Sequence, residues 1–227
     1  MDKRRTIEEV KNDIRSRVGH HAPFLYADKH EAEEALANMD TFEGETWAAA
    51  WNELGARWEG QAKTAEEAGD RAQAKNAYLK SYGYYSIASH PFPSSPGKRR
   101  SYAKTREMFL AASKYFDVPV ERVSILFRDR AIVGHLRLTK KLPAPMIMHW
   151  GGIDNWKEER HSFGETLVKE GWGCFIMDSP GTGACPVLAG PDAHAVHTNS
   201  ALVEFYLAPP YFRHDEGAAQ DRERSPC

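Results

Sequence analysis

Cysteine, net charge and long apolar stretches are all scarce in this sequence of 227 residues. The formal charge is only −2, which argues against nucleic acid as a partner because phosphate binding needs a basic surface. No apolar run approaches the roughly 20 residues of a membrane-spanning helix, and the start MDKRRTIEEV predicts a charged helix instead of a signal peptide. The three cysteines have no metal-ligand spacing and fit a reducing compartment, so we expect a cytoplasmic protein.

Residues 1–118 are predicted to form a helical domain. Apolar residues recur at helical spacing in two stretches, at Ile7, Val10, Ile14 and Val18 and at Trp47, Trp51, Leu54 and Trp58. Gly69 predicts a helix end, and Asp70 predicts the N-cap of a further helix that reaches about Ala88. Residues 90–98 hold three prolines in nine positions and predict a loop.

The aromatic residues of this helical part have two interpretations. A stripe of aromatic side chains that faces a core needs no function, and this interpretation covers most of them. Alternatively, Tyr82, Tyr84 and Tyr85 line a substrate cavity, which makes Tyr85 a candidate substrate-binding residue.

From Glu121 the hydrophobic period changes and predicts an α/β fold. Residues 121–127 and 131–139 alternate as the two strands of a hairpin. The apolar stretches 145–150 and 171–178 enclose a helix of about 14 residues, which predicts a β-α-β unit with buried parallel strands. Another helix is expected from about Ala193 to Leu207. Residues 208–227 lack Val, Ile, Leu and Met and carry seven charges in twenty positions, so we expect this tail to be disordered.

The chemistry is expected at the strand ends, because parallel sheets bind ligands there. In HWGGIDNWKEER (149–160), two glycines leave backbone N–H groups uncovered, and one such donor to an oxyanion contributes about 10²–10³ in rate. A tight turn that needs glycine for its backbone angles is an equally good interpretation of the spacing. The second turn, DSPGTGACP (178–186), lacks the dinucleotide and P-loop fingerprints, and we expect Asp178 to brace it by hydrogen bonds.

The sequence shows no recognisable nucleophile, because no serine lies in a G-x-S-x-G motif. It also shows no metal-ligand pattern, so we predict no metal site.

Four motifs are together similar to one known subfamily. They are AYLKSYGYYSIASHPFP, SPGKRRSYAKTREMF, HWGGIDNWKEERHSFGETLVKEGW and DSPGTGACPVLAGPDA. The stretch from about Trp47 to Leu207 resembles the α/β-hydrolases that include FrsA-like esterases and 2,6-dihydroxypseudooxynicotine hydrolases. The resemblance implies a helical cap domain (1–118) and the first half of a hydrolase sheet (119–207). It also implies cleavage of a small-molecule ester, or of a C–C bond next to a ketone, by a Ser-His-Asp triad without a cofactor.

The resemblance also suggests site residues. The backbone of Gly151, Gly152 and Ile153 matches the oxyanion-hole turn of the family. Trp150, Asp154 and Glu158 become candidates for orienting substrate, although the helix dipole alone favours an acidic residue at a helix start.

The end of the sequence departs from the family pattern. In the family, a strand and a nucleophile elbow would follow at this point, but this sequence has the charged tail 208–227 there. We therefore expect a C-terminally truncated chain without a triad and without activity. The alternative is a non-enzymatic remnant, or a helical binding module that pairs with another chain. Without a neighbouring strand, residues 146–150 would form an exposed edge, which predicts a homodimer or aggregation.

Overall fold

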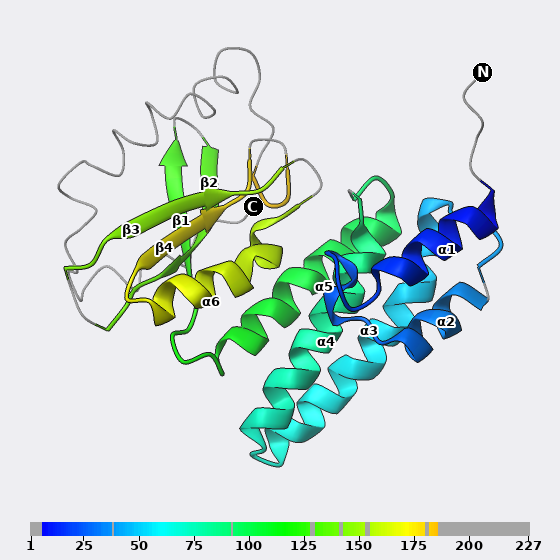
Figure 1. Cartoon of the computed structure of the whole chain (residues 1–227), viewed down its shortest axis with the longest axis horizontal. Helices are drawn as coiled ribbons and strands as arrows, with labels where there is room; N and C mark the ends of the chain where they lie inside the picture. Colours follow the sequence, from blue (N-terminus) through cyan, green and yellow to red (C-terminus); the bar gives the residue numbers. More distant parts are fainter. Residues whose placement is uncertain are drawn as a thin grey trace. The chain divides into compact units, whose positions relative to one another are not determined.

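The computed structural model of the chain describes residues 6–37, 39–91, 93–127, 130–140, 143–152, 155–179 and 182–185. The chain divides into two compact units, residues 1–120 and 121–227. The first is helical and the second contains the sheet (Figure 1). The helix expected at 193–207 and the tail 208–227 lie outside the described residues.

The first unit contains five α-helices and a short 3₁₀ helix in its described part. They are α1 (Ile7–Arg17), η1 (Phe24–Tyr26), α2 (Lys29–Ala37), α3 (Gly44–Glu67), α4 (Arg71–Ser89) and α5 (Pro96–Ser113). The predicted boundary between α3 and α4 is confirmed: Gly69 has a φ of +74°, which favours glycine, and Asp70 accepts a hydrogen bond from the Gln73 amide at 3.0 Å.

The loop expected over residues 90–98 ends earlier than predicted. Ser95 caps α5 by accepting from the Lys98 amide at 3.3 Å, and Pro96 is the first helical residue. Proline is tolerated there because the first helical N–H has no partner within the helix.

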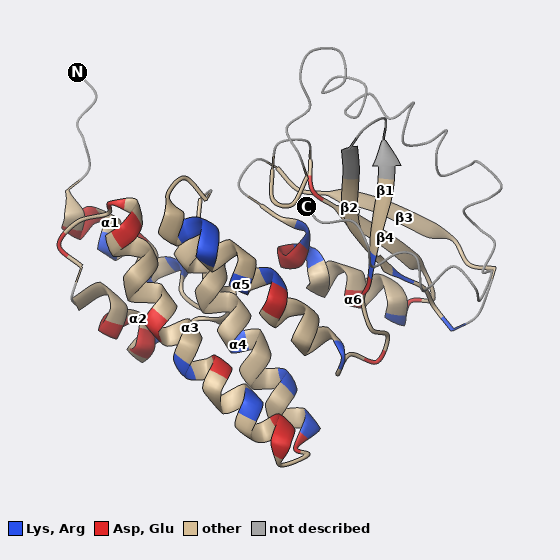
Figure 2. Cartoon of the chain, turned by 180° about the vertical axis from the view of Figure 1, so that it is seen from behind, with Lys and Arg blue, Asp and Glu red and all other residues tan. Residues whose placement is uncertain are grey.

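Helix α4 is the centre of the first unit, with 12 of its 19 residues buried, so other segments cover it on most sides. Small residues let neighbouring segments approach α4 closely. A Cβ at Gly55 in α3 would lie 2.9 Å from the Tyr85 ring, and one at Gly83 would lie 2.6 Å from Tyr26. The Ser81 hydroxyl donates to the Gly55 carbonyl at 2.9 Å. Charges of both signs are interspersed along the helices (Figure 2).

In its described part, the second unit contains a four-stranded mixed sheet with the strand order β1-β2-β4-β3. Its elements are β1 (Glu121–Phe127), β2 (Arg130–Arg137), β3 (Met146–Trp150), η2 (Lys157–Arg160), α6 (His161–Lys169) and β4 (Gly173–Met177). The β1–β2 hairpin is antiparallel, and β3 pairs with β4 in parallel, so the predicted hairpin and β-α-β unit are confirmed.

Burial differs between the two parallel strands. Every residue of β4 is buried, whereas β3 is only half-buried, so the expectation that both strands are buried is wrong for β3. The reason is position: β4 lies between β2 and β3, and β3 is the last strand of the described sheet. Within the described ranges, every helix is too short or too polar to cross a lipid bilayer.

Candidate active site

The carboxyl ends of β3 and β4 meet at one edge of the sheet because these strands are parallel. Gly151 and Gly152 follow β3, and Asp178 and Ser179 follow β4. This edge also holds Trp150, at the end of β3 and 36% exposed. The structure therefore brings most of the predicted turn residues together, while Ile153 and Asp154 lie outside the described residues.

Gly151 is glycine for a steric reason. A Cβ at this position would lie 2.0 Å from the carbonyl oxygen of Asn155, far closer than two atoms can approach. The Gly151 carbonyl accepts a hydrogen bond from Ser179 Oγ at 3.0 Å. Gly152, the next residue, is exposed. A close turn thus explains the first glycine, which is buried, while Gly152 beside it is exposed.

Asp178 braces the second strand-end turn by a hydrogen bond, as the sequence predicted, and it also binds Lys157 at the end of the first, which was not predicted. Its Oδ1 accepts from the Lys157 amide and its Oδ2 from Lys157 Nζ, both at 2.8 Å. Oδ2 also accepts from the Ala184 amide at 2.8 Å. Gly183 beside it has a φ of +52°, and a Cβ there would lie 2.3 Å from Oδ2. The carboxylate thus fixes the second turn as well as the start of η2.

A buried charged cluster lies behind the turn and was not predicted. Lys157 Nζ is 2.8 Å from Glu158 Oε1 as well as from Asp178 Oδ2, and all three side chains are almost fully buried. Burial lowers the pKa of Lys157, but the two carboxylates outweigh it and the pKa is raised. His135 Nε2 lies 3.9 Å from Glu158 Oε1, and burial holds the pKa of this imidazole well below its usual value.

Glu158 therefore lies in a buried ion pair, although the sequence suggested it for orienting substrate. Sequence reasoning also missed Lys157 and His135. The letters WKEER resemble an ordinary charged helix start, and only the distance to Asp178 reveals the cluster. In the described part of the chain, no group of His, Cys, Asp and Glu is arranged to hold a metal ion.

Tyr85, the candidate from the helical part, is 5% exposed within the core of the first unit. Its hydroxyl donates to Glu59 Oε2 at 3.0 Å, and Glu59 also accepts from Lys63 Nζ at 2.7 Å and Lys104 Nζ at 3.1 Å. Its role in substrate binding stays a prediction.

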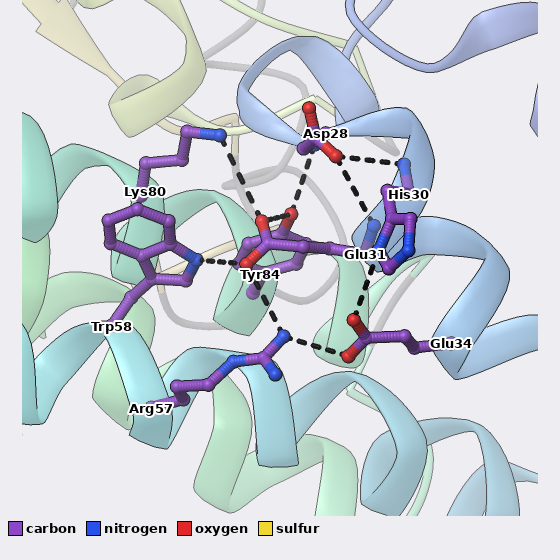
Figure 3. A network of polar contacts seen from close by, with 8 residues as sticks. All are labelled: Asp28, His30, Glu31, Glu34, Arg57, Trp58, Lys80 and Tyr84. Carbon is purple, nitrogen blue, oxygen red and sulfur yellow. Dashed lines mark hydrogen bonds and ion pairs between the residues drawn. The ribbon is translucent and has the colours of Figure 1, made fainter.

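Tyr84 takes part in a second polar network of the helical unit (Figure 3). Its hydroxyl donates to Glu31 on α2, and the same carboxylate accepts from Trp58 Nε1 at 2.8 Å. Arg57 lies 3.3 Å from Glu31 and 2.9 Å from Glu34. The network fastens α2 to α3 and α4.

Known proteins are similar to this chain along most of its length. The family model described as Esterase FrsA-like matches residues 7–199. The α/β-hydrolase gkaG of Penicillium citrinum is 32% identical over 165 residues, 67% of this chain and 38% of gkaG. The 20-hydroxy-prefusarin hydrolase FUS2 of Gibberella moniliformis is 24% identical over 71% of this chain and 41% of its own. The chain thus spans about two fifths of the length of these curated relatives.

Solved structures show the same fold. The 2,6-dihydroxy-pseudo-oxynicotine hydrolase superposes with a TM-score of 0.64 at 18% identity, over 85% of this chain and 55% of that chain. AbyA5 superposes with a TM-score of 0.62 at 21% identity, over 85% of this chain and 50% of that chain.

Proposed function

This chain belongs to the FrsA-like esterase family of α/β-hydrolases, and we propose that it supplies the helical domain and the first strands of a serine hydrolase. The proposed substrate is a small molecule with an ester, or with a C–C bond next to a ketone. The observation that carries the proposal is the Gly151–Gly152 turn at the carboxyl end of β3, where Gly151 accepts a hydrogen bond from Ser179, which follows β4.

In the proposed reaction the turn stabilises negative charge. The backbone N–H groups at Gly151, Gly152 and Ile153 are the proposed donors to the oxyanion, and losing one such donor lowers the rate by about 10²–10³. The sequence contains no G-x-S-x-G motif, so we propose that the 227-residue chain by itself lacks turnover.

The test uses a chimaera that joins residues 1–199 to the C-terminal remainder of gkaG. We expect the chimaera to hydrolyse p-nitrophenyl acetate and the 227-residue chain not to do so. Gly152→Pro removes the backbone donor and should lower kcat by about 10²–10³, whereas Gly152→Ala keeps the N–H and should retain most activity. Equal turnover by the Gly152→Pro variant, or by the 227-residue chain alone, would refute the assignment.

The proposal extends to partners and compartment. The outer side of β3 has no paired strand in the described sheet, and unpaired edges recruit other chains. We propose that the 227-residue chain forms a homodimer through β3, and a size-exclusion mass that stays monomeric at high concentration would contradict this. The three cysteines of the sequence have no metal-ligand spacing, which supports the proposal of a reducing, cytoplasmic compartment.

A further inference from the structure

Two consecutive residues after β4 fasten both ends of the connection from β3 to η2. At its start, Ser179 Oγ donates to the carbonyl oxygen of Gly151 at 3.0 Å. At its end, the Lys157 amide donates to Asp178 Oδ1 at 2.8 Å. Ser179 and Asp178 are only 8% and 1% exposed, so water competes little for these bonds.

The bond from Ser179 sets the direction of the next peptide group. The cis peptide bonds in the described part of the chain precede Pro23 and Pro91, so the bond between Gly151 and Gly152 is trans. In a planar trans peptide the C=O and the N–H point in opposite directions. With its carbonyl held toward Ser179, this group directs the Gly152 N–H away from Ser179, at an exposed position.

The glycines cannot fix this direction themselves. Glycine has the greatest backbone freedom of all residues, and Gly151 has no room for a side chain that would restrict it. An oxyanion donor is effective only when it is oriented before the reaction. A hydrogen bond to the peptide group supplies such a restraint, and the Ser179 hydroxyl donates one to the carbonyl concerned.

We propose that Ser179, supported by Asp178, is a positioning residue that orients the Gly152 amide as an oxyanion donor. The orientation follows from the contacts of this chain, while its catalytic meaning rests on the proposed function. Ser179 acts here as a hydrogen-bond donor to the turn, a role distinct from that of the nucleophile.

The test measures the backbone order of Gly152 by ¹⁵N relaxation in the glycine-labelled 227-residue chain. We expect an order parameter of about 0.85 in the native chain and below about 0.6 in Ser179→Ala. Ser179→Thr keeps the hydroxyl and should restore the native value. Gly173 in β4 is the internal reference and should stay unchanged in both variants, which separates a local effect from general loosening of the sheet.

The kcat of the chimaera separates the positioning role of Ser179 from the proposed oxyanion role of the Gly152 amide. In the chimaera with gkaG, Ser179→Ala should lower kcat for p-nitrophenyl acetate by about 10–10² at unchanged KM. Unchanged order at Gly152 in Ser179→Ala would overturn the positioning role. Lost order at Gly152 with unchanged kcat would instead refute the oxyanion assignment on which its catalytic meaning rests.

Discussion

Replacing Asp178 with asparagine tests how strongly the buried cluster holds the second unit together. The substitution keeps the size of the side chain and an oxygen that accepts from the Lys157 amide. It removes the negative charge 2.8 Å from Lys157 Nζ and from the Ala184 amide. The ammonium group then keeps a single carboxylate partner, Glu158, also at 2.8 Å.

The magnitude follows from the burial of both partners. Breaking a buried ion pair by removing one partner costs about 3–5 kcal/mol, because the other charge stays buried. Since Glu158 still faces Lys157, we expect the lower end, about 3 kcal/mol. Since about 1.4 kcal/mol corresponds to a factor of ten, this loss of stability increases the unfolding equilibrium constant of the second unit by about 10².

Hydrogen exchange measured by mass spectrometry separates the two units. In Asp178→Asn, peptides covering β4 should lose about 10² in protection, while peptides covering α4 keep theirs. The matched control is Lys169→Met in the same unit. Lys169 is exposed and 3.9 Å from Glu165, so its removal should cost less than about 1 kcal/mol. Equal loss in the variant and the control, or equal loss in β4 and α4, would refute the reasoning.

Three further predictions concern single positions. Gly151→Ala should displace the turn, because its Cβ meets the Asn155 carbonyl at 2.0 Å, and β3 and β4 should lose exchange protection. Glu31→Ala leaves the Tyr84 hydroxyl without its carboxylate and should reduce protection of α4 by about 1–3 kcal/mol. Burial raises the pKa of Glu59, but its bonded lysines and tyrosine outweigh this and lower it below 4.5. The carboxylate therefore stabilises the first unit above about pH 4.5, and this contribution is lost as the pH falls through the lowered pKa. In an acid titration, the exchange protection of α3 and α4 should fall less steeply in Glu59→Gln than in the native chain.

Each of these has its own check. Gly173→Ala is the control for the turn, because its Cβ would meet nothing closer than 3.6 Å, and equal effects of the two substitutions would contradict the steric argument. Unchanged α4 protection in Glu31→Ala would show that the network of Figure 3 adds nothing to stability. If the native chain and Glu59→Gln lose protection equally as the pH falls, Glu59 does not contribute to the acid sensitivity of the first unit.

Local signals predicted much of the fold. The end of α3 and the start of α4 followed from Gly69 and Asp70, because a left-handed residue and an N-cap act within a few residues. Pro96 misled the prediction because the same residue breaks a helix interior and starts a helix well. The burial of β3 was misjudged because it depends on which strands are its neighbours, and this is a property of the topology.

The candidate site was predictable only in part. The Gly151–Gly152 turn and the bracing by Asp178 follow from residue types at strand ends. The bond from Ser179 to Gly151 joins residues 28 apart, and the bond from Lys157 to Asp178 joins residues 21 apart. Periodicity carries no information on such distances, so the sequence did not reveal the pairing of Lys157 with Glu158 and Asp178.

Lys157 offers the sharpest test of whether the cluster works by charge. Lys157→Met removes the cation and leaves the carboxylates of Glu158 and Asp178 buried together, so it should cost more than Asp178→Asn. A buried carboxylate without a cation takes up a proton, and the folded variant then binds more protons than the unfolded chain. Its stability relative to the native chain should rise as the pH is lowered, because a state that binds more protons is favoured at lower pH. Asp178→Asn keeps Lys157 paired and should show no such recovery. The measurement is the exchange protection of β4 in the variant divided by that in the native chain at each pH. If this ratio does not change with pH for Lys157→Met, lost packing and not uncompensated charge causes the instability of the variant.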